Sequence, residues 1–249
     1  MISPKIEKFV QVLGRNQSHC LRCTGPEAYI GLRYDAEESS VRMVVSAGSQ
    51  RSADLNPESQ QWLFDKGFRR KRMSDDFEKS FKEEGVSSQL IEQMVRDIFE
   101  QCFGNPPSRC DLIELPPLES DDSHVLEAMN LLSTKRDWNA RKTLYRMLIE
   151  TWFVFPVDES GEPLVEDKIA SWPVCATFTS YAALFRHHPA GVTCKVVKGS
   201  ELFSDLVTRK FGSLRINPGS DTRGELYFNE LEMLKDAAEK LAKHYAGRR

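Results

Sequence analysis

The chain has 249 residues, of which 40% are hydrophobic and 29% are charged, and its net charge is −3 at pH 7. This composition is typical of a globular protein with one large or two small domains, and the lack of a basic excess argues against nucleic acid as the main partner. The apolar runs are far shorter than the ~20 residues of a membrane span, and residues 1–10 lack a signal-peptide pattern, so we expect a cytoplasmic protein that does not bind membranes.

The first hundred residues have the pattern of a helix, a group of strands and further helices. Alternating β-branched and aromatic residues predict the strands, and apolar residues at helical spacing predict the helices. The expected helices cover 4–14, 56–67 and 86–103, and the expected strands cover 27–34, 40–47 and 76–81.

Two of these helices have clear end signals. Asn56 is a good N-cap, Pro57 suits the first helical position, and Gly67 ends the pattern. Within residues 86–103 apolar side chains recur every three or four positions, which predicts one continuous apolar face that stops at Gly104.

A break between domains is predicted over residues 105–123. This segment has two Pro-Pro pairs, one basic residue and five acidic residues. Proline lacks a backbone donor and disfavours helical geometry in the residue before it, so a helix cannot cross the segment. We therefore predict two domains, residues 1–104 and 124–249, joined by a stiff acidic connector.

Strands and helices alternate in the second half, whereas the first half groups its strands together. The expected helices cover 124–150, 180–188, 199–212 and 229–247, and the expected strands cover 151–157, 172–180, 191–197 and 213–217. Together the two halves predict an α+β protein, with a helix–antiparallel sheet–helix domain followed by a mixed α/β domain.

Six cysteines are present, and Cys20 and Cys23 have the CxxC spacing of zinc and redox sites. A structural zinc site needs four ligands, and the remaining cysteines form no second matched pair. A redox CxxC opens a helix after a strand, but here Gly25 and Pro26 lead into a predicted strand. We expect reduced cysteines that act as small buried residues and bind no metal, and any redox role of this pair is left open.

Local motifs of catalysis do not occur in the sequence. It has no dinucleotide fingerprint, no Walker loop and no nucleophile elbow. His187 and His188 end a predicted helix, where they complement the helix dipole, and Asp75 and Asp76 are expected as solvated carboxylates in a polar turn. The expectation is therefore a protein that is not an enzyme and uses no cofactor, with an enzyme whose site comes from scattered residues as an alternative.

The loop Asn217-Pro218-Gly219 follows the last predicted strand. Asn217 and Gly219 can adopt turn conformations, and Pro218 ends strand pairing. A phosphate site needs consecutive backbone amides, and proline removes one. The loop is therefore interpreted as structural, with surface recognition as the alternative.

Four consecutive cations, Arg69, Arg70, Lys71 and Arg72, are the candidate partner-binding residues. Such a run also occurs as a solvated strand edge, where charge blocks unwanted pairing. Because the run has no interleaved aromatic residues, we do not interpret it as a nucleic-acid site. As a binding feature it would steer an acidic protein partner toward an apolar contact.

The second half resembles the SseB family, named for enhanced serine sensitivity, in residues 152–157, 172–185 and 214–220. The order and spacing of these stretches also fit, and the resemblance covers about residues 138–235. It implies an SseB-like mixed α/β domain. The first half resembles the fold of type III secretion chaperones and YbjN-like proteins, whose members bind other proteins and use no known cofactor.

These resemblances imply a cytoplasmic chaperone or adaptor for a cognate client protein, such as a secreted effector. An alternative is an immunity protein that binds and neutralises a bacterial toxin. The client, the choice between these roles, and whether the chain forms a homodimer are left open.

Overall fold

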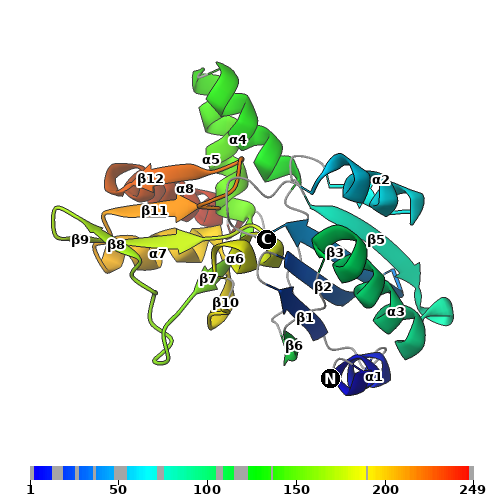
Figure 1. Cartoon of the computed structure of the whole chain (residues 1–249). Coiled ribbons are helices and arrows are strands. Elements are labelled where there is room, and N and C mark those ends of the chain that lie inside the picture. Colours follow the sequence, from blue (N-terminus) through cyan, green and yellow to red (C-terminus); the bar gives the residue numbers. More distant parts are fainter. Residues whose placement is uncertain are drawn as a thin grey trace. The chain divides into compact units, whose positions relative to one another are not determined.

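The computed structural model has the α+β class predicted from the sequence (Figure 1). It describes residues 3–12, 19–25, 28–35, 38–47, 55–71, 76–104, 109–114, 123–135, 137–188 and 190–246. Contacts within the chain define two compact units, of which the first comprises Met1–Pro117 and Phe185–Pro189 and the second comprises Leu118–Leu184 and Ala190–Arg249. The predicted domain boundaries at residues 104 and 124 stay a prediction. Among the described helices, none combines the length and apolarity of a bilayer span.

The first unit is an antiparallel sheet with helices. Its elements are α1 (Ser3–Val12), β1 (His19–Gly25), β2 (Ala28–Asp35), β3 (Ser40–Ala47), α2 (Pro57–Asp65), β4 (Arg69–Arg70), β5 (Phe77–Lys82), a 3-10 turn (Glu83–Gly85), α3 (Ser88–Ile98) continued by a π-helical turn (Phe99–Phe103), and β6 (Arg109–Glu114). The strand order is β4-β5-β3-β2-β1-β6.

The helix ends of the first unit follow the local signals in the sequence. The Asn56 side chain accepts a hydrogen bond from the backbone N–H of Ser59 at 2.7 Å, and Gly67 follows α2 with a φ of 82°. The turn after α3 ends at Gly104 with a φ of 69°. Positive φ favours glycine because it has no Cβ, so both predicted stops are confirmed.

The core of the first unit lies on one face of the sheet. Ile30 and Leu32 of β2 pair with Val45 and Met43 of β3, and all four are buried. The apolar side of α3 joins this cluster, as its spacing predicted. Leu90 differs from the prediction, because it remains 40% exposed at the first turn of α3.

Two strands of this sheet were not predicted, β1 and β6. β1 contains the CxxC residues, and β6 lies inside the segment 105–123 that was interpreted as a connector. The two strands pair with each other although they are far apart in the chain. Local residue patterns carry no information on such long-range pairing. The clearest local signal near β6 is the prolines on either side of it, and these led to the interpretation as a connector.

Asp76 corrects another expectation. It was interpreted as a solvated carboxylate, but it is 3% exposed. Within the first unit it forms an ion pair with Arg186, and Arg186 also donates a hydrogen bond to Ser46 Oγ at 2.7 Å. A carboxylate at this depth needs such a charge partner, because removing it from water is costly.

The described part from Ser123 onward has eleven elements, all of which belong to the second unit except the end of α6, where the residues from Phe185 belong to the first unit. They are α4 (Ser123–Lys135), α5 (Trp138–Glu150), β7 (Trp152–Pro156), β8 (Asp167–Ile169), β9 (Trp172–Thr177), α6 (Tyr181–His187), β10 (Cys194–Lys198), α7 (Gly199–Thr208), β11 (Ser213–Ile216), β12 (Gly224–Tyr227) and α8 (Phe228–Ala246). The strands form a four-stranded sheet in the order β12-β11-β9-β8 and a pair, β10-β7. The short strands β8 and β12 were not predicted.

One face of the four-stranded sheet is part of the core. Leu214 and Ile216 of β11 and Leu226 of β12 are buried on this face, and α7 and α8 pack on the same side (Figure 1). β9 and β11 run parallel with α6, β10 and α7 between them in the chain. A parallel pair needs such a crossover, which agrees with the alternation predicted for this half.

The Asn217-Pro218-Gly219 loop has the structural role that was predicted. Asn217 is 2% exposed and has a φ of 49°, and Gly219 has a φ of 80°. The Asn217 side chain accepts a hydrogen bond from the Thr179 N–H and donates one to Thr179 Oγ1, both at 2.9 Å. The loop therefore ties the end of β11 to the segment that follows β9.

Candidate functional site

One face of the four-stranded sheet has three large exposed side chains, whereas Val174 and Ser213 between them are buried. Ile169 and Trp172 are opposite each other in the β8–β9 register. Val174 is two residues from Trp172 and pairs with Ser213, which in turn pairs with Tyr227. Register partners and residues two apart share a face of a sheet, so Ile169, Trp172 and Tyr227 are on the same face. We call these three residues the aromatic face.

The aromatic face is accessible and partly held in place. Ile169, Trp172 and Tyr227 are 44%, 43% and 53% exposed. The Trp172 ring lies 5.4 Å from the Phe228 ring. Gly212 makes room for Trp172, because a Cβ at this glycine would be 2.6 Å from the Trp172 Cβ. Trp172 is therefore positioned before any partner binds.

A row of charges crosses the same face of the sheet. Arg215 lies 3.1 Å from Asp167 and 3.7 Å from Glu225, and the Ser213 hydroxyl donates a hydrogen bond to Glu225 at 2.7 Å. The backbone N–H of Lys168, and then Arg215, lower the pKa of Asp167. Asp167 is therefore ionised at neutral pH, and Arg215 lies between two acidic side chains.

This combination is typical of a protein-binding surface. Tryptophan, tyrosine and arginine are enriched among the residues that contribute most to protein–protein affinity. Aromatic rings bury a large apolar area, while the tyrosine hydroxyl can still bond to water or to a partner. The charged row beside the rings would form the polar part of such an interface.

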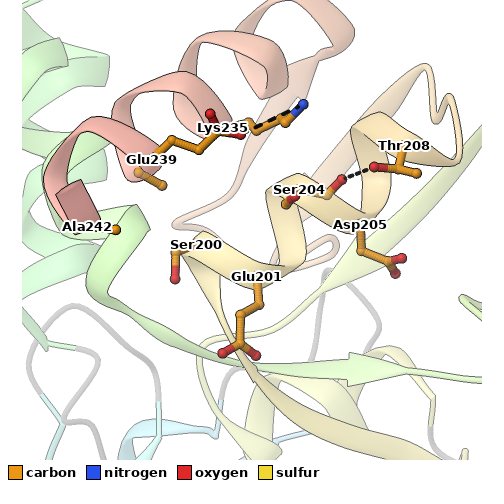
Figure 2. Close-up of a pocket in the computed structure, with 9 residues that line it drawn as sticks. Ser200, Glu201, Ser204, Asp205, Thr208, Lys235, Glu239 and Ala242 are labelled. Carbon is orange, nitrogen blue, oxygen red and sulfur yellow. Dashed lines mark hydrogen bonds and ion pairs between the residues drawn. The ribbon is translucent and has the colours of Figure 1, made fainter. Parts of the chain in front are cut away.

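A second feature of this unit is a groove of about 570 Å³ between α7 and α8 (Figure 2). The residues that line it are Ser200, Glu201, Ser204, Asp205, Thr208, Lys235, Ala238, Glu239 and Ala242. Three of these lining residues are acidic, and none of the nine is a histidine or a cysteine.

Several polar groups of the groove interact with each other or with nearby side chains. Thr208 Oγ1 donates to the Ser204 carbonyl at 2.8 Å, and Lys235 lies 4.0 Å from Glu239. Asp205 is paired with Arg209 at 2.7 Å.

The four candidate partner-binding cations of the first unit do not lie together on one surface patch in the described residues. Arg69 and Arg70 form the short edge strand β4, and both are exposed, while Lys71 is half-buried. Successive residues of a strand point to opposite faces, so these two arginines do not share one patch. Arg72 lies outside the described residues. The sequence allowed two interpretations of this run, a solvated strand edge or a partner-binding feature. The position of Arg69 and Arg70 on β4 agrees with the strand edge.

The cysteine expectation is wrong for Cys23. Cys23 is buried, as expected for a small core residue, but it is bonded in a disulfide. Among the other thiols, burial raises the pKa of Cys102 to about 11 and also raises that of Cys175. Such thiols stay protonated at neutral pH and are poor nucleophiles.

The structure also places two histidines and a further tryptophan. His187 ends α6, as predicted, and its ring lies 4.7 Å from that of His188. Trp138 is 66% exposed at the start of α5. Sequence reasoning did not find Tyr227 or Ile169, because β8 and β12 are too short to show a pattern.

Comparison of the chain with protein-family models, with curated proteins and with solved structures finds no match. The resemblances described above therefore stay predictions.

Proposed function

We propose that the chain is a non-enzymatic protein-binding protein, a chaperone or adaptor that holds a client protein on its aromatic face. The single observation that supports this most is the exposure of Ile169, Trp172 and Tyr227 together on one sheet face. Isolated exposed apolar residues are common on protein surfaces, but a cluster of large ones suggests an interaction site.

The geometry favours a partner with an apolar segment. Trp172 is held by Phe228, so binding loses little side-chain entropy at this position. Arg215 and its two acidic neighbours are already paired, so a partner does not need an opposite charge to satisfy them. Apolar burial would then supply most of the affinity.

A client that binds in the cytoplasm fits the composition of the chain, and this location is part of the proposal. The cationic run from Arg69 to Arg72 would act on the approach of an acidic client rather than hold it. Its first two residues are exposed, and exposed charges mainly change association rates.

The aromatic face is tested by site-specific cross-linking. A photoreactive phenylalanine analogue is placed at Trp172, at Tyr227, or at Trp138 as the control, in cells that produce the chain naturally. We expect one discrete cross-linked protein from the first two positions and none from the third. Equal cross-linking from all three positions would argue against a specific face.

The affinity of the partner found in this way is then measured with purified proteins. The double variant Trp172→Ala/Tyr227→Ala should bind at least about 30-fold more weakly, because central aromatic residues typically contribute 2 kcal/mol or more. Trp138→Ala, which removes an even more exposed tryptophan outside the face, should bind normally. Unchanged affinity of the double variant, with its fold intact by circular dichroism, would sink the proposal.

The cationic run is tested by reversing Arg69, Arg70, Lys71 and Arg72 to glutamate. Association with an acidic partner should slow by roughly tenfold at low salt and change less at physiological salt, where charges are screened beyond ~8–10 Å. The control reverses four exposed cations of the second unit, Lys142, Lys210, Lys240 and Lys243, so that the net charge changes by the same amount. An association rate that is equally slow in both variants would show an effect of net charge only.

A further inference from the structure

Cys23 is bonded in a disulfide whose partner can be inferred from the sheet. It lies in β1, is fully buried, and belongs to the core cluster of the first unit. Three of the other five cysteines, Cys102, Cys175 and Cys194, keep their thiols. Cys20 and Cys110 remain as partners within the chain.

Strand geometry excludes Cys20. Cys20 and Cys23 are three positions apart on β1, and such positions face opposite sides of a sheet. At about 3.3 Å per residue their Cα atoms are separated by roughly 10 Å. A disulfide requires a Cα separation of about 4.4–6.8 Å. The CxxC spacing that suggests a redox pair therefore cannot form one on an extended strand.

Cys110 meets the geometric requirement. In the antiparallel β1–β6 register it is directly opposite Cys23, and such pairs have Cα separations of roughly 4.5–5.5 Å. Directly opposite residues also share a face of the sheet. Cys23 pairs with Ile30 of β2 on its other side, and Ile30 is buried in the core, so the shared face is the core face.

We propose that Cys23 and Cys110 form a disulfide that fastens the edge strand β6 to β1. The two thiols lose two protons and two electrons to a small-molecule disulfide such as oxidised glutathione, which is reduced to two thiols. Exchange proceeds through a mixed disulfide in which one thiolate has displaced half of the oxidant. This proposal does not depend on the binding role proposed above, but in a reducing cytoplasm it applies only to protein that has met an oxidant.

The bond would close a loop that contains most of the first unit, from β2 to the turn after α3. Long loops lose the most conformational entropy when they are cross-linked, so the effect on the unfolded chain is large. Because Cys23 is fully buried, a reductant reaches the bond only when β6 separates from β1. Disulfides are rare in reducing compartments, so in the cytoplasm β6 would be held by strand pairing alone.

Tryptic digestion separates the alternatives, because trypsin cuts after Arg22 and Arg109. The full-length protein is purified without reductant, denatured, alkylated and digested. We expect peptide 23–33 linked to peptide 110–135. A link between 16–22 and 23–33 would instead show a Cys20–Cys23 bond, and six alkylated cysteines would show none. Recovery of the 23–33/110–135 link only from a dimer band in non-reducing electrophoresis would show that this bond joins two chains. Each of these three results overturns the proposal.

Thermal unfolding gives a second readout that does not depend on peptide recovery. Dithiothreitol should lower the unfolding temperature of the first unit by roughly 10–15 °C in the wild type. Cys110→Ser should show no such response, whereas Cys20→Ser, the matched control, should respond as the wild type does. The double variant Cys23→Ala/Cys110→Ala also lacks the bond but buries no serine hydroxyl. Comparing its unfolding temperature with that of Cys110→Ser therefore shows how much of the loss comes from the hydroxyl. A response to dithiothreitol that persists in Cys110→Ser would refute this pairing.

Discussion

Replacing Gly199 by alanine is expected to lower the free energy of unfolding of the second unit by about 3–5 kcal/mol, a large part of the 5–15 kcal/mol by which domains are stable. The added Cβ would lie 1.9 Å from the Leu148 carbonyl oxygen and 3.2 Å from the Phe153 ring. Both neighbours are fully buried. Neither can move away without disturbing the packing around it.

The need for glycine comes from the way two helices meet. Gly199 begins α7 directly after β10, and its N–H donates a hydrogen bond to the Thr151 carbonyl at 2.8 Å, at the C-terminal end of α5. The two helix ends are in contact because no side chain lies between them. With alanine they must separate, which also breaks this hydrogen bond.

Thermal and urea unfolding of Gly199→Ala measure this effect. Three of the four tryptophans, Trp138, Trp152 and Trp172, belong to the second unit, so their fluorescence reports mainly on that unit. Ser200→Ala is the control, because Ser200 is the next residue of α7 and lies at the open groove; its effect should stay within about 0.5 kcal/mol. An unchanged midpoint for Gly199→Ala would contradict the observed contact with Leu148.

Replacing Asn217 by alanine is expected to cost about 3–4 kcal/mol. Alanine removes the acceptor for the Thr179 N–H and the donor to Thr179 Oγ1, at a site where both residues are at most 2% exposed. Each buried polar group that loses its partner costs about 1–3 kcal/mol. The φ of 49° adds roughly 1 kcal/mol, because alanine tolerates the left-handed region less well than asparagine.

Asn217→Gly separates the two contributions. Glycine adopts positive φ freely, so this variant should lose only the hydrogen bonds and be about 1 kcal/mol more stable than Asn217→Ala. Urea unfolding of both variants measures the difference. Equal stabilities would mean that the backbone conformation contributes nothing, and wild-type stability in both would mean that the loop does not hold β11 to the segment after β9.

The features that the sequence predicted correctly depend on local physics. The N-cap at Asn56, the glycines that end α2 and the turn after α3, and the turn at Asn217 each follow from the conformation or hydrogen bonding of single residues. The apolar side of α3 follows from a spacing within one helix. Such signals need no knowledge of distant parts of the chain.

The predictions that were wrong concern residues whose environment comes from elsewhere in the chain. Asp76 was expected in solvent and is buried against Arg186. Cys23 was expected as a thiol and is in a disulfide, opposite a residue of a strand that was interpreted as part of a connector. The aromatic face was missed for the same reason, because Ile169, Trp172 and Tyr227 come from three strands that align only in the folded sheet.

The sequence by itself determined the α+β class, most helices and longer strands, and the turns, because hydrophobic periodicity, capping and glycine conformation act within a few residues. The tertiary structure alone decided which short strands pair, which charges are buried, and which side chains share a face. Those outcomes depend on strand register, where a shift of one residue moves every side chain to the opposite face. The candidate binding face of this protein is a product of that register.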